Sequence, residues 1–235
     1  PEIIDLVGFL RSMGARISGE GTSVVEVEGV EELRPGSQEV MPDRLEAGTY
    51  MFAAAAAGGD VTVDGVVAEH LDMVCEKLVD CGMEVDGGPD WVRVRSEGRP
   101  RPADVSTLPY PGFPTDLQPL MVAVLTRARG LSIVTENIFD GRFMYIDELA
   151  RMGADVRTEG HYIVIRGVER LTGAPVVASD LRAGAALVVA ALAAEGWTSV
   201  ENIAQIDRGY ERFEERLSSL GARIRRAPAG DLVEA

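Results

Sequence analysis

The sequence predicts an α/β protein built from a repeated unit of roughly 70 residues. Four segments share the pattern Leu-x-x-x-Gly, and their glycines, Gly14, Gly82, Gly153 and Gly221, lie 68, 71 and 68 residues apart. Three other segments alternate with these, and each begins with an aspartate and continues as an apolar run. The two kinds of segment together indicate a unit of helix, strand, helix and strand pair.

The first kind of segment predicts a helix that ends at its glycine. Before Gly82, for example, Leu71, Val74 and Leu78 recur at the intervals of three and four that are typical of one helix face. Glycine readily adopts the left-handed conformation of a helix C-cap. Short runs rich in β-branched residues follow three of the glycines and predict strands at 24–27, 91–94 and 162–165.

The second kind of segment predicts a helix with an aspartate N-cap, because this side chain accepts hydrogen bonds from free backbone N–H groups. The aspartates are Asp43, Asp116 and Asp180, and the helices are expected to end at Gly58, Gly130 and Gly196. Strands are predicted after them, at 61–63, 131–134 and 198–200. Three such units packed around an axis would place their helices inside and their sheets outside.

The chain enters this repeat part-way, because no aspartate-opened segment precedes the first glycine pattern. We therefore expect residues 1–40 to be the tail of an upstream domain and residues 41–235 to form a three-unit domain. Pro35-Gly36 marks the expected boundary loop. Since the chain starts at Pro1 and not at Met, we also expect its native N-terminus to lie further upstream.

The composition argues against several classes of function. A net charge of −15 disfavours a nucleic-acid partner, because a phosphate backbone requires a basic surface. No apolar run is long enough to span a bilayer, so no membrane partner is expected. Cys75 and Cys81 lie on one predicted helix without a histidine cluster, which predicts buried thiols, no metal site and a reduced, cytoplasmic location. No cofactor is expected.

Several ordered strings resemble the UDP-N-acetylglucosamine enolpyruvyl transferases, also called UDP-N-acetylglucosamine 1-carboxyvinyltransferases. The resemblance extends from Glu2 to about Arg226, and its strings lie at 41–49, 113–118, 136–144, 179–183 and 206–212. It implies inverse α/β barrel (α/β prism) domains, each built from three βαβαββ-like repeats. This chain would be the C-terminal portion, with one such barrel and, at its N-terminus, a partial repeat of a second.

The resemblance also implies an activity. Such enzymes transfer the enolpyruvyl group of phosphoenolpyruvate to the 3′-hydroxyl of UDP-N-acetylglucosamine and release phosphate. This is the first committed step of peptidoglycan precursor synthesis, which serves cell wall biogenesis, cell shape and cell division. The catalytic cysteine loop of the family belongs to the upstream half. We expect that N-terminal domain to be the missing partner of this chain, and the fragment alone to be inactive.

The resemblance makes Asp116 the catalytic carboxylate, which contacts the sugar hydroxyl and accepts its proton. The alternative is an ordinary helix N-cap. It also places a phosphoenolpyruvate-binding arginine at Arg208, which we expect at the start of the last helix, where the helix dipole favours anions. The alternative there is a surface ion pair with Glu211 or Glu214.

Further substrate-binding candidates lie at equivalent places of successive units. Arg142 and Arg182 are expected near helix starts, and parallel helices would bring those starts to one end of the barrel. Asp180 is repeat-equivalent to Asp116, with capping as its alternative role. By resemblance, Ile138 and Phe139 contact the nucleotide sugar, and core packing is the alternative.

Two other functions stay open. One is the shikimate-pathway enolpyruvyl transferase, which is disfavoured because the string at 207–211, Asp-Arg-Gly-Tyr-Glu, lacks the Lys-Glu signature expected there. The other is a paralogue that binds a ligand or partner without catalysis. A cysteine loop and a matching lysine in the upstream sequence would favour the enzyme.

Overall fold

The computed structural model describes residues 1–228, which divide into two compact units. The first unit is Pro1–Asp43 and the second begins at Arg44. The first contains helix α1 (Glu2–Ser12) and a hairpin of strands β1 (Arg16–Ser18) and β2 (Glu26–Glu28). The hairpin is antiparallel, with Ile17 opposite Val27. The strand predicted at 24–27 thus lies two residues further along the chain.

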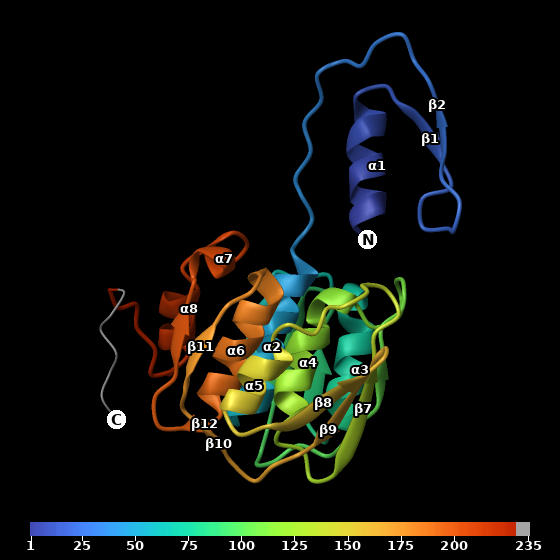
Figure 1. Cartoon of the computed structure of the whole chain (residues 1–235). Coiled ribbons are helices and arrows are strands. Elements are labelled where there is room, and N and C mark those ends of the chain that lie inside the picture. The colour runs from blue at the N-terminus through green and yellow to red at the C-terminus, as the bar shows by residue number, and fades with distance from the viewer. Residues whose placement is uncertain (229–235) are drawn as a thin grey trace. The chain divides into compact units, whose positions relative to one another are not determined.

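Three apolar helices form the centre of the second unit (Figure 1). They are α2 (Arg44–Ala57), α4 (Gln118–Leu125) and α6 (Leu181–Leu192), and each contacts the other two. Their alanines and glycines permit this close approach. Gly48, for example, lies so near Leu117 that an added Cβ would stand 2.6 Å from Leu117 Cδ1. Helices that are apolar on all sides are buried helices, and these three supply much of the core.

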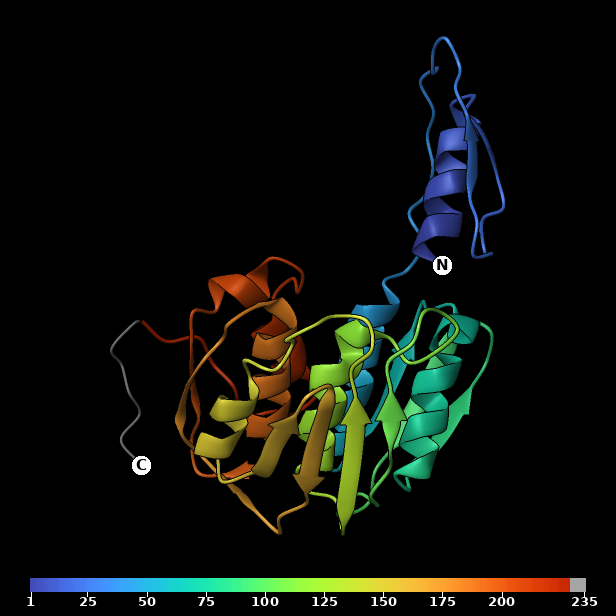
Figure 2. The ribbon, with the colours of Figure 1, turned by 45° about the vertical axis from the view of Figure 1, so that its right-hand side comes forward.

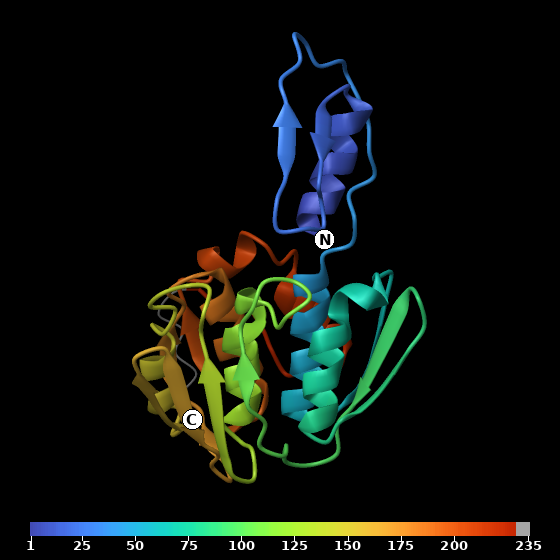
Figure 3. The same ribbon diagram turned by 90° about the vertical axis from the view of Figure 1, so that its right-hand side faces the viewer.

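Two sheets lie outside these helices, one antiparallel and one mixed, since β6 and β7 pair in parallel (Figure 3). The first has the order β3-β5-β4 and is formed by β3 (Asp60–Asp64), β4 (Glu84–Gly87) and β5 (Trp91–Arg95). The second has the order β6-β7-β9-β8. It is formed by β6 (Val105–Ser106), β7 (Leu131–Thr135), β8 (Asp155–Glu159) and β9 (Tyr162–Arg166). Alternate residues face the core, as Val92 and Val94 do on β5.

The second unit contains further helices. They include the 3₁₀ helix η1 (Ala68–Leu71), α3 (Asp72–Asp80), α5 (Ile146–Arg151), α7 (Ala204–Asp207) and α8 (Phe213–Ser219). The expected C-cap glycines are confirmed, because Gly14, Gly82, Gly153 and Gly221 all have φ between 86° and 100°. Cys75 lies on α3 and Cys81 follows it.

Two short parallel pairs complete the second unit: β10 (Leu171–Thr172) with β12 (Ala194–Glu195), and β11 (Pro175–Val177) with β13 (Ser199–Glu201). Among these four strands only β13 was predicted from the sequence, because the other three are too short to show an alternation of apolar and polar residues. The parallel pairs β6–β7 and β11–β13 matter for the site, since each encloses one of the central helices, α4 or α6.

The predicted helix ends at Gly130 and Gly196 were wrong, whereas Gly58 does follow α2 directly. Helix α4 ends at Leu125, and the Thr126 side chain then donates to Ala123 O at 2.6 Å. Gly130 is needed for close approach, because a Cβ there would lie 2.9 Å from Pro102 Cγ. Gly196 has a φ of 86°, but it follows β12 and not α6.

The segment after Gly221 differs from the segments after Gly82 and Gly153, which form strands. Residues 222–228, which follow α8 and Gly221, form no strand in the part of the chain that the structure describes. No helix among the described residues is both long and apolar enough to cross a bilayer.

Candidate functional site

The central helices begin at the same end of the second unit (Figure 2). The 3₁₀ turn η2 (Thr115–Leu117), which leads into α4, contacts α2. An ion pair between Arg182 and Asp116 joins the starts of α6 and α4. Positive dipole ends of several helices therefore gather at one place, as the sequence analysis expected of parallel helices.

Asp116 lies between two arginines at this end. Arg142 Nη1 donates a hydrogen bond of 2.7 Å to Asp116 Oδ1, and Arg182 Nε donates one of 3.4 Å to Asp116 Oδ2. The N-cap of α4 is Leu117, so the alternative of an ordinary capping aspartate was wrong for Asp116. Its carboxylate, one-third exposed, remains available to a ligand.

Arg182 is the buried member of this group, with 8% of its surface exposed. Its Nη1 donates to the hydroxyl of Tyr210 at 3.0 Å, and that hydroxyl lies 2.8 Å from Thr49 Oγ1 on α2. Because the Thr49 hydroxyl donates its proton to Leu45 O, Tyr210 is the donor to Thr49. Polar side chains thus join η2, α6, α2 and the segment after α7 in one network.

Arg142 lies before α5 and makes two further contacts. Its Nη1 also donates to Thr115 Oγ1 at 3.1 Å, and its guanidinium stands 4.7 Å from the centroid of the Phe139 ring. Ile138 and Phe139 are 46% and 55% exposed, so the alternative of core packing was wrong for both. They form an apolar surface beside the arginine that a ligand can reach.

Asp180 is the N-cap of α6, the role given above as its alternative. Its side chain accepts from the backbone N–H groups of Arg182 and Ala183, both at 2.9 Å. Capping orders the first turn of α6 and so orients Arg182, which belongs to that turn. Asp180 and Asp116 occupy equivalent places in the repeat but make different contacts. Asp180 caps α6, whereas Asp116 accepts hydrogen bonds from Arg142 and Arg182.

The expected position of Arg208 was wrong. It is the C-cap residue of α7, and α8 begins only at Phe213. The chain leaves the helix here because Tyr210 turns inward and Arg212 adopts a left-handed φ of 51°. Arg208 Nη1 donates to Gln205 Oε1 at 3.1 Å, so the alternative pairing with Glu211 or Glu214 is replaced by this contact.

The segment that carries Arg208 still packs against the start of α6. A Cβ on Gly209 would lie 3.0 Å from Leu181 Cδ2, and one on Gly184 would lie 2.6 Å from Ile206 Cγ1. Leu181 immediately precedes Arg182. Arg208 is therefore at the same end of the unit as Asp116, although no hydrogen bond joins the two side chains within residues 1–228.

Tyr145 and Gln118 lie beneath the site and are fully buried. Burial raises the pKa of Tyr145 well above its ordinary value, and the nearby Glu136 carboxylate raises it further. The hydroxyl therefore keeps its proton and donates to Gln118 Oε1 at 2.9 Å. This pair ties the segment before α5 to the first turn of α4.

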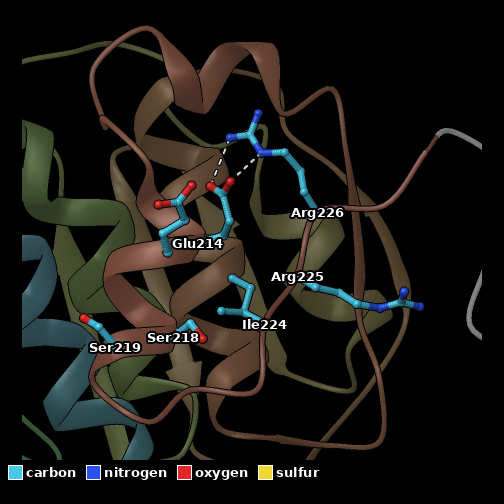
Figure 4. Close-up of a pocket in the computed structure, with 7 residues that line it drawn as sticks. Glu214, Ser218, Ser219, Ile224, Arg225 and Arg226 are labelled. Carbon is cyan, nitrogen blue, oxygen red and sulfur yellow. Dashed lines mark hydrogen bonds and ion pairs between the residues drawn. The ribbon is translucent and has the colours of Figure 1, made fainter.

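A pocket elsewhere on the second unit is lined by Glu214, Glu215, Ser218, Ser219, Ile224, Arg225 and Arg226 (Figure 4). It lies between α8 and the segment that follows it, and it contains none of the candidate residues. Within residues 1–228, no group of three or more His, Cys, Asp or Glu side chains is placed to hold a metal ion.

The sequence predicted no role for Thr49, Thr115, Glu136 or Tyr210, which the structure joins to the site. All four residues lie inside the strings that carry the family resemblance, at 41–49, 113–118, 136–144 and 206–212. Nothing in their local sequence distinguishes them from other polar residues, because their partners are distant along the chain.

The fold and the site define a class of protein. The chain belongs to the EPSP synthase (3-phosphoshikimate 1-carboxyvinyltransferase) family, whose model matches residues 1–217. Among solved structures, the enolpyruvyl transferase NikO from Streptomyces tendae is 29% identical and superimposes with a TM-score of 0.82, covering 94% of this chain and 53% of NikO. An EPSP synthase from Acinetobacter baumannii, 20% identical with a TM-score of 0.73 over 93% of this chain and 54% of its own, shares the α/β fold.

Curated relatives confirm the narrower resemblance. A protein named UDP-N-acetylglucosamine 1-carboxyvinyltransferase 2 from Symbiobacterium thermophilum is 55% identical over 98% of this chain. One named UDP-N-acetylglucosamine 1-carboxyvinyltransferase 1 from Carboxydothermus hydrogenoformans is 50% identical over 96% of it. The chain spans about half the length of these relatives, 54% in both cases.

Proposed function

We propose that this chain is the C-terminal portion of an enzyme that transfers the enolpyruvyl group of phosphoenolpyruvate to the 3′-hydroxyl of UDP-N-acetylglucosamine, with release of phosphate. One observation carries the proposal. The carboxylate of Asp116 lies between Arg142 and Arg182, 2.7 and 3.4 Å away, at the end where the central helices begin. The names of relatives at 50–55% identity support the choice of substrates.

The chemistry is an addition followed by an elimination. The sugar hydroxyl attacks C2 of phosphoenolpyruvate while C3 gains a proton, and phosphate then leaves as C3 loses a proton. Asp116 would accept the hydroxyl proton, because a carboxylate within hydrogen-bond reach can act as a general base. Arg142, Arg182 and Arg208 would neutralise the phosphate and carboxylate groups, since guanidinium groups bind both with paired hydrogen bonds.

The nucleotide sugar would lie against Ile138 and Phe139, which are exposed beside Arg142. Asp180 would act mainly through α6, whose first turn it caps. The general acid and the remaining substrate contacts belong to the upstream half of the protein in this proposal. We also propose that the second unit is an inverse α/β barrel of three repeats, and that the first unit completes an upstream barrel.

The activity would serve peptidoglycan precursor synthesis in the cytoplasm. The test is to express the complete reading frame and measure phosphate release from phosphoenolpyruvate, which should depend on UDP-N-acetylglucosamine and not on shikimate 3-phosphate. Asp116→Ala should lower turnover by at least about 10²-fold. The 235-residue chain alone should release no phosphate, because reacting groups split between two domains must be held together. Binding of the nucleotide sugar without turnover by the complete protein would instead indicate a non-catalytic paralogue.

A further inference from the structure

Glu136 is a buried carboxylate that meets three separate segments of the site. It directly follows β7, and only 2% of its surface is exposed. Its Oε1 accepts from the hydroxyl of Thr107 at 2.8 Å and from the backbone N–H groups of Ile138 and Phe139 at 2.8 and 2.9 Å. Its Oε2 accepts a hydrogen bond of 3.0 Å from the hydroxyl of Thr115.

These four donors explain how the carboxylate is tolerated in the interior. A buried charge without hydrogen-bond partners is strongly unfavourable, and N–H and O–H donors offset that penalty. The donors come from the end of β6, from the turn before α4 and from the segment after β7. Glu136 therefore fixes the positions of these three segments relative to one another.

Thr115 links Glu136 to Asp116, because it donates to Glu136 and accepts from Arg142, which also donates to Asp116. A hydroxyl has a single proton, and Thr115 donates its proton to Glu136. Only its lone pairs remain for Arg142, whose Nη1 donates to Thr115 Oγ1 at 3.1 Å. The same nitrogen also donates to Asp116, so two acceptors hold Arg142, and Glu136 orients one of them.

We propose that Glu136 is a positioning residue for the active site, which holds the Asp116–Arg142 pair in place through Thr115 and holds the Ile138–Phe139 segment through its backbone. The proposal rests on the proposed function for its kinetic consequences. Glu136 itself is covered by the four donors and does not touch substrate. Its loss should therefore move both ends of the site, the general base and the apolar surface for the nucleotide sugar.

Glu136→Gln in the complete protein is the most direct test, because it changes one acceptor atom into a donor at constant shape. If the new NH₂ group faces Thr115, that hydroxyl must turn its proton toward Arg142, which is also a donor. If the NH₂ group takes the place of Oε1, it lies against the N–H groups of Ile138 and Phe139, which are also donors. Either arrangement displaces the site, and displacements of this kind lower kcat/KM by about 10²-fold.

A matched control and a rescue separate positioning from general stability. Glu148 on α5 also accepts a backbone N–H group, that of Val177 at 3.1 Å, and Glu148→Gln should change kcat/KM by less than about threefold. Thr115→Ser keeps the hydroxyl and should keep most activity, whereas Thr115→Val should resemble Glu136→Gln. The double variant should lose no more than about the larger single loss, because the two residues act in one path.

Three results would overturn the proposal: wild-type kcat/KM in Glu136→Gln, equal losses in Glu136→Gln and Glu148→Gln, or losses that multiply in the double variant. Failure of the wild-type protein to release phosphate would refute the proposed function instead. Amide hydrogen exchange then decides the positioning role by itself. Exchange at Ile138 and Phe139 should accelerate in Glu136→Gln relative to β9, and unchanged exchange would reject the role.

Discussion

Arg142 Nη1 donates a 2.7 Å hydrogen bond to Asp116 Oδ1 and thereby connects two turns that are 26 residues apart in the sequence. Neither turn is regular α-helix, since Asp116 lies in η2 and Arg142 precedes α5. The contact is made possible by the parallel pair β6–β7, which returns the chain to the same end of the unit after α4. Asp116 and Arg142 thus follow two neighbouring strands of one sheet.

Replacement of Arg142 by lysine should lower kcat/KM of the complete protein by about tenfold, which corresponds to about 1.4 kcal/mol. Lysine keeps the charge but lacks the planar group that stands 4.7 Å from the Phe139 ring centroid. Arg151→Lys is the control, because Arg151 is an exposed arginine of α5. Steady-state kinetics check the prediction, and equal values for wild type and Arg142→Lys would contradict it.

Tyr210→Phe should destabilise the protein by about 1–3 kcal/mol, because it leaves buried partners without a hydroxyl. The hydroxyl accepts from Arg182 and donates to Thr49, and Tyr210 is 1% exposed. The ring can remain stacked on Phe213, whose centroid lies 4.8 Å away. Urea unfolding measures the change. Tyr162→Phe, at a tyrosine that is 48% exposed on β9, should change stability by less than about 0.5 kcal/mol.

Arg226 should contribute a small, pH-dependent stabilisation. Its guanidinium donates to Asp207 and Glu214 and lowers the pKa of both carboxyls from ordinary values of 3.8 and 4.5. A carboxyl with a lowered pKa in the folded state stabilises the fold above its ordinary pKa, and this contribution is lost as the pH falls below it.

Arg226→Ala should therefore be less stable than wild type at pH 7, by less than about 1 kcal/mol because the pairs are exposed. The difference should shrink as the pH falls through 4.5 and 3.8. Figure 4 shows the adjacent Arg225 directed away from Glu214, so Arg225→Ala is the matched control. A stability difference that is the same at pH 3 and pH 7 would contradict the assignment. Thermal or urea unfolding over this pH range measures it.

The two thiols should be unreactive in the folded protein. Burial, with smaller effects of nearby aspartates, raises the pKa of Cys75 to about 11 and that of Cys81 to about 12. Because the thiolate is the nucleophile, iodoacetamide at pH 8 should modify them about 10²-fold more slowly than in the denatured chain. Mass spectrometry of timed samples measures both rates. Rapid labelling of either thiol in native protein would show that burial does not protect it.

The regular elements of the second unit were largely predictable, because their signals are local. The spacing of Leu71, Val74 and Leu78 by three and four residues predicted a helix, which the structure has at Asp72–Asp80. The short runs rich in β-branched residues at 91–94 and 162–165 predicted β5 and β9 to within one residue. Most strands of two or three residues could not be found, with β2 and β13 as the exceptions, since such strands form only when a partner strand is already in place.

The candidate site was predictable only in part. The family resemblance singled out Asp116 and the repeat pattern singled out Arg142 and Arg182, and the structure brings both arginines into contact with Asp116. The sequence did not distinguish an aspartate that binds a ligand from one that caps a helix, because both precede an apolar helical run. Asp180 has the extended backbone of an N-cap, with a φ of −152°, whereas the 3₁₀ turn at Thr115–Leu117 delays the start of α4 and leaves Asp116 free of that task.

By itself, the amino-acid sequence determined the repeat, the identity and approximate limits of most helices and strands, and the family. These properties depend on residues close together in the chain, where periodicity and glycine conformation act. The tertiary structure alone decided that Glu136 is buried among four donors, that Tyr210 links Thr49 to Arg182, and that Arg208 follows a helix and does not begin one. Burial and hydrogen-bond direction depend on partners dozens of residues away, and only packing of the central helices and their sheets brings those partners together.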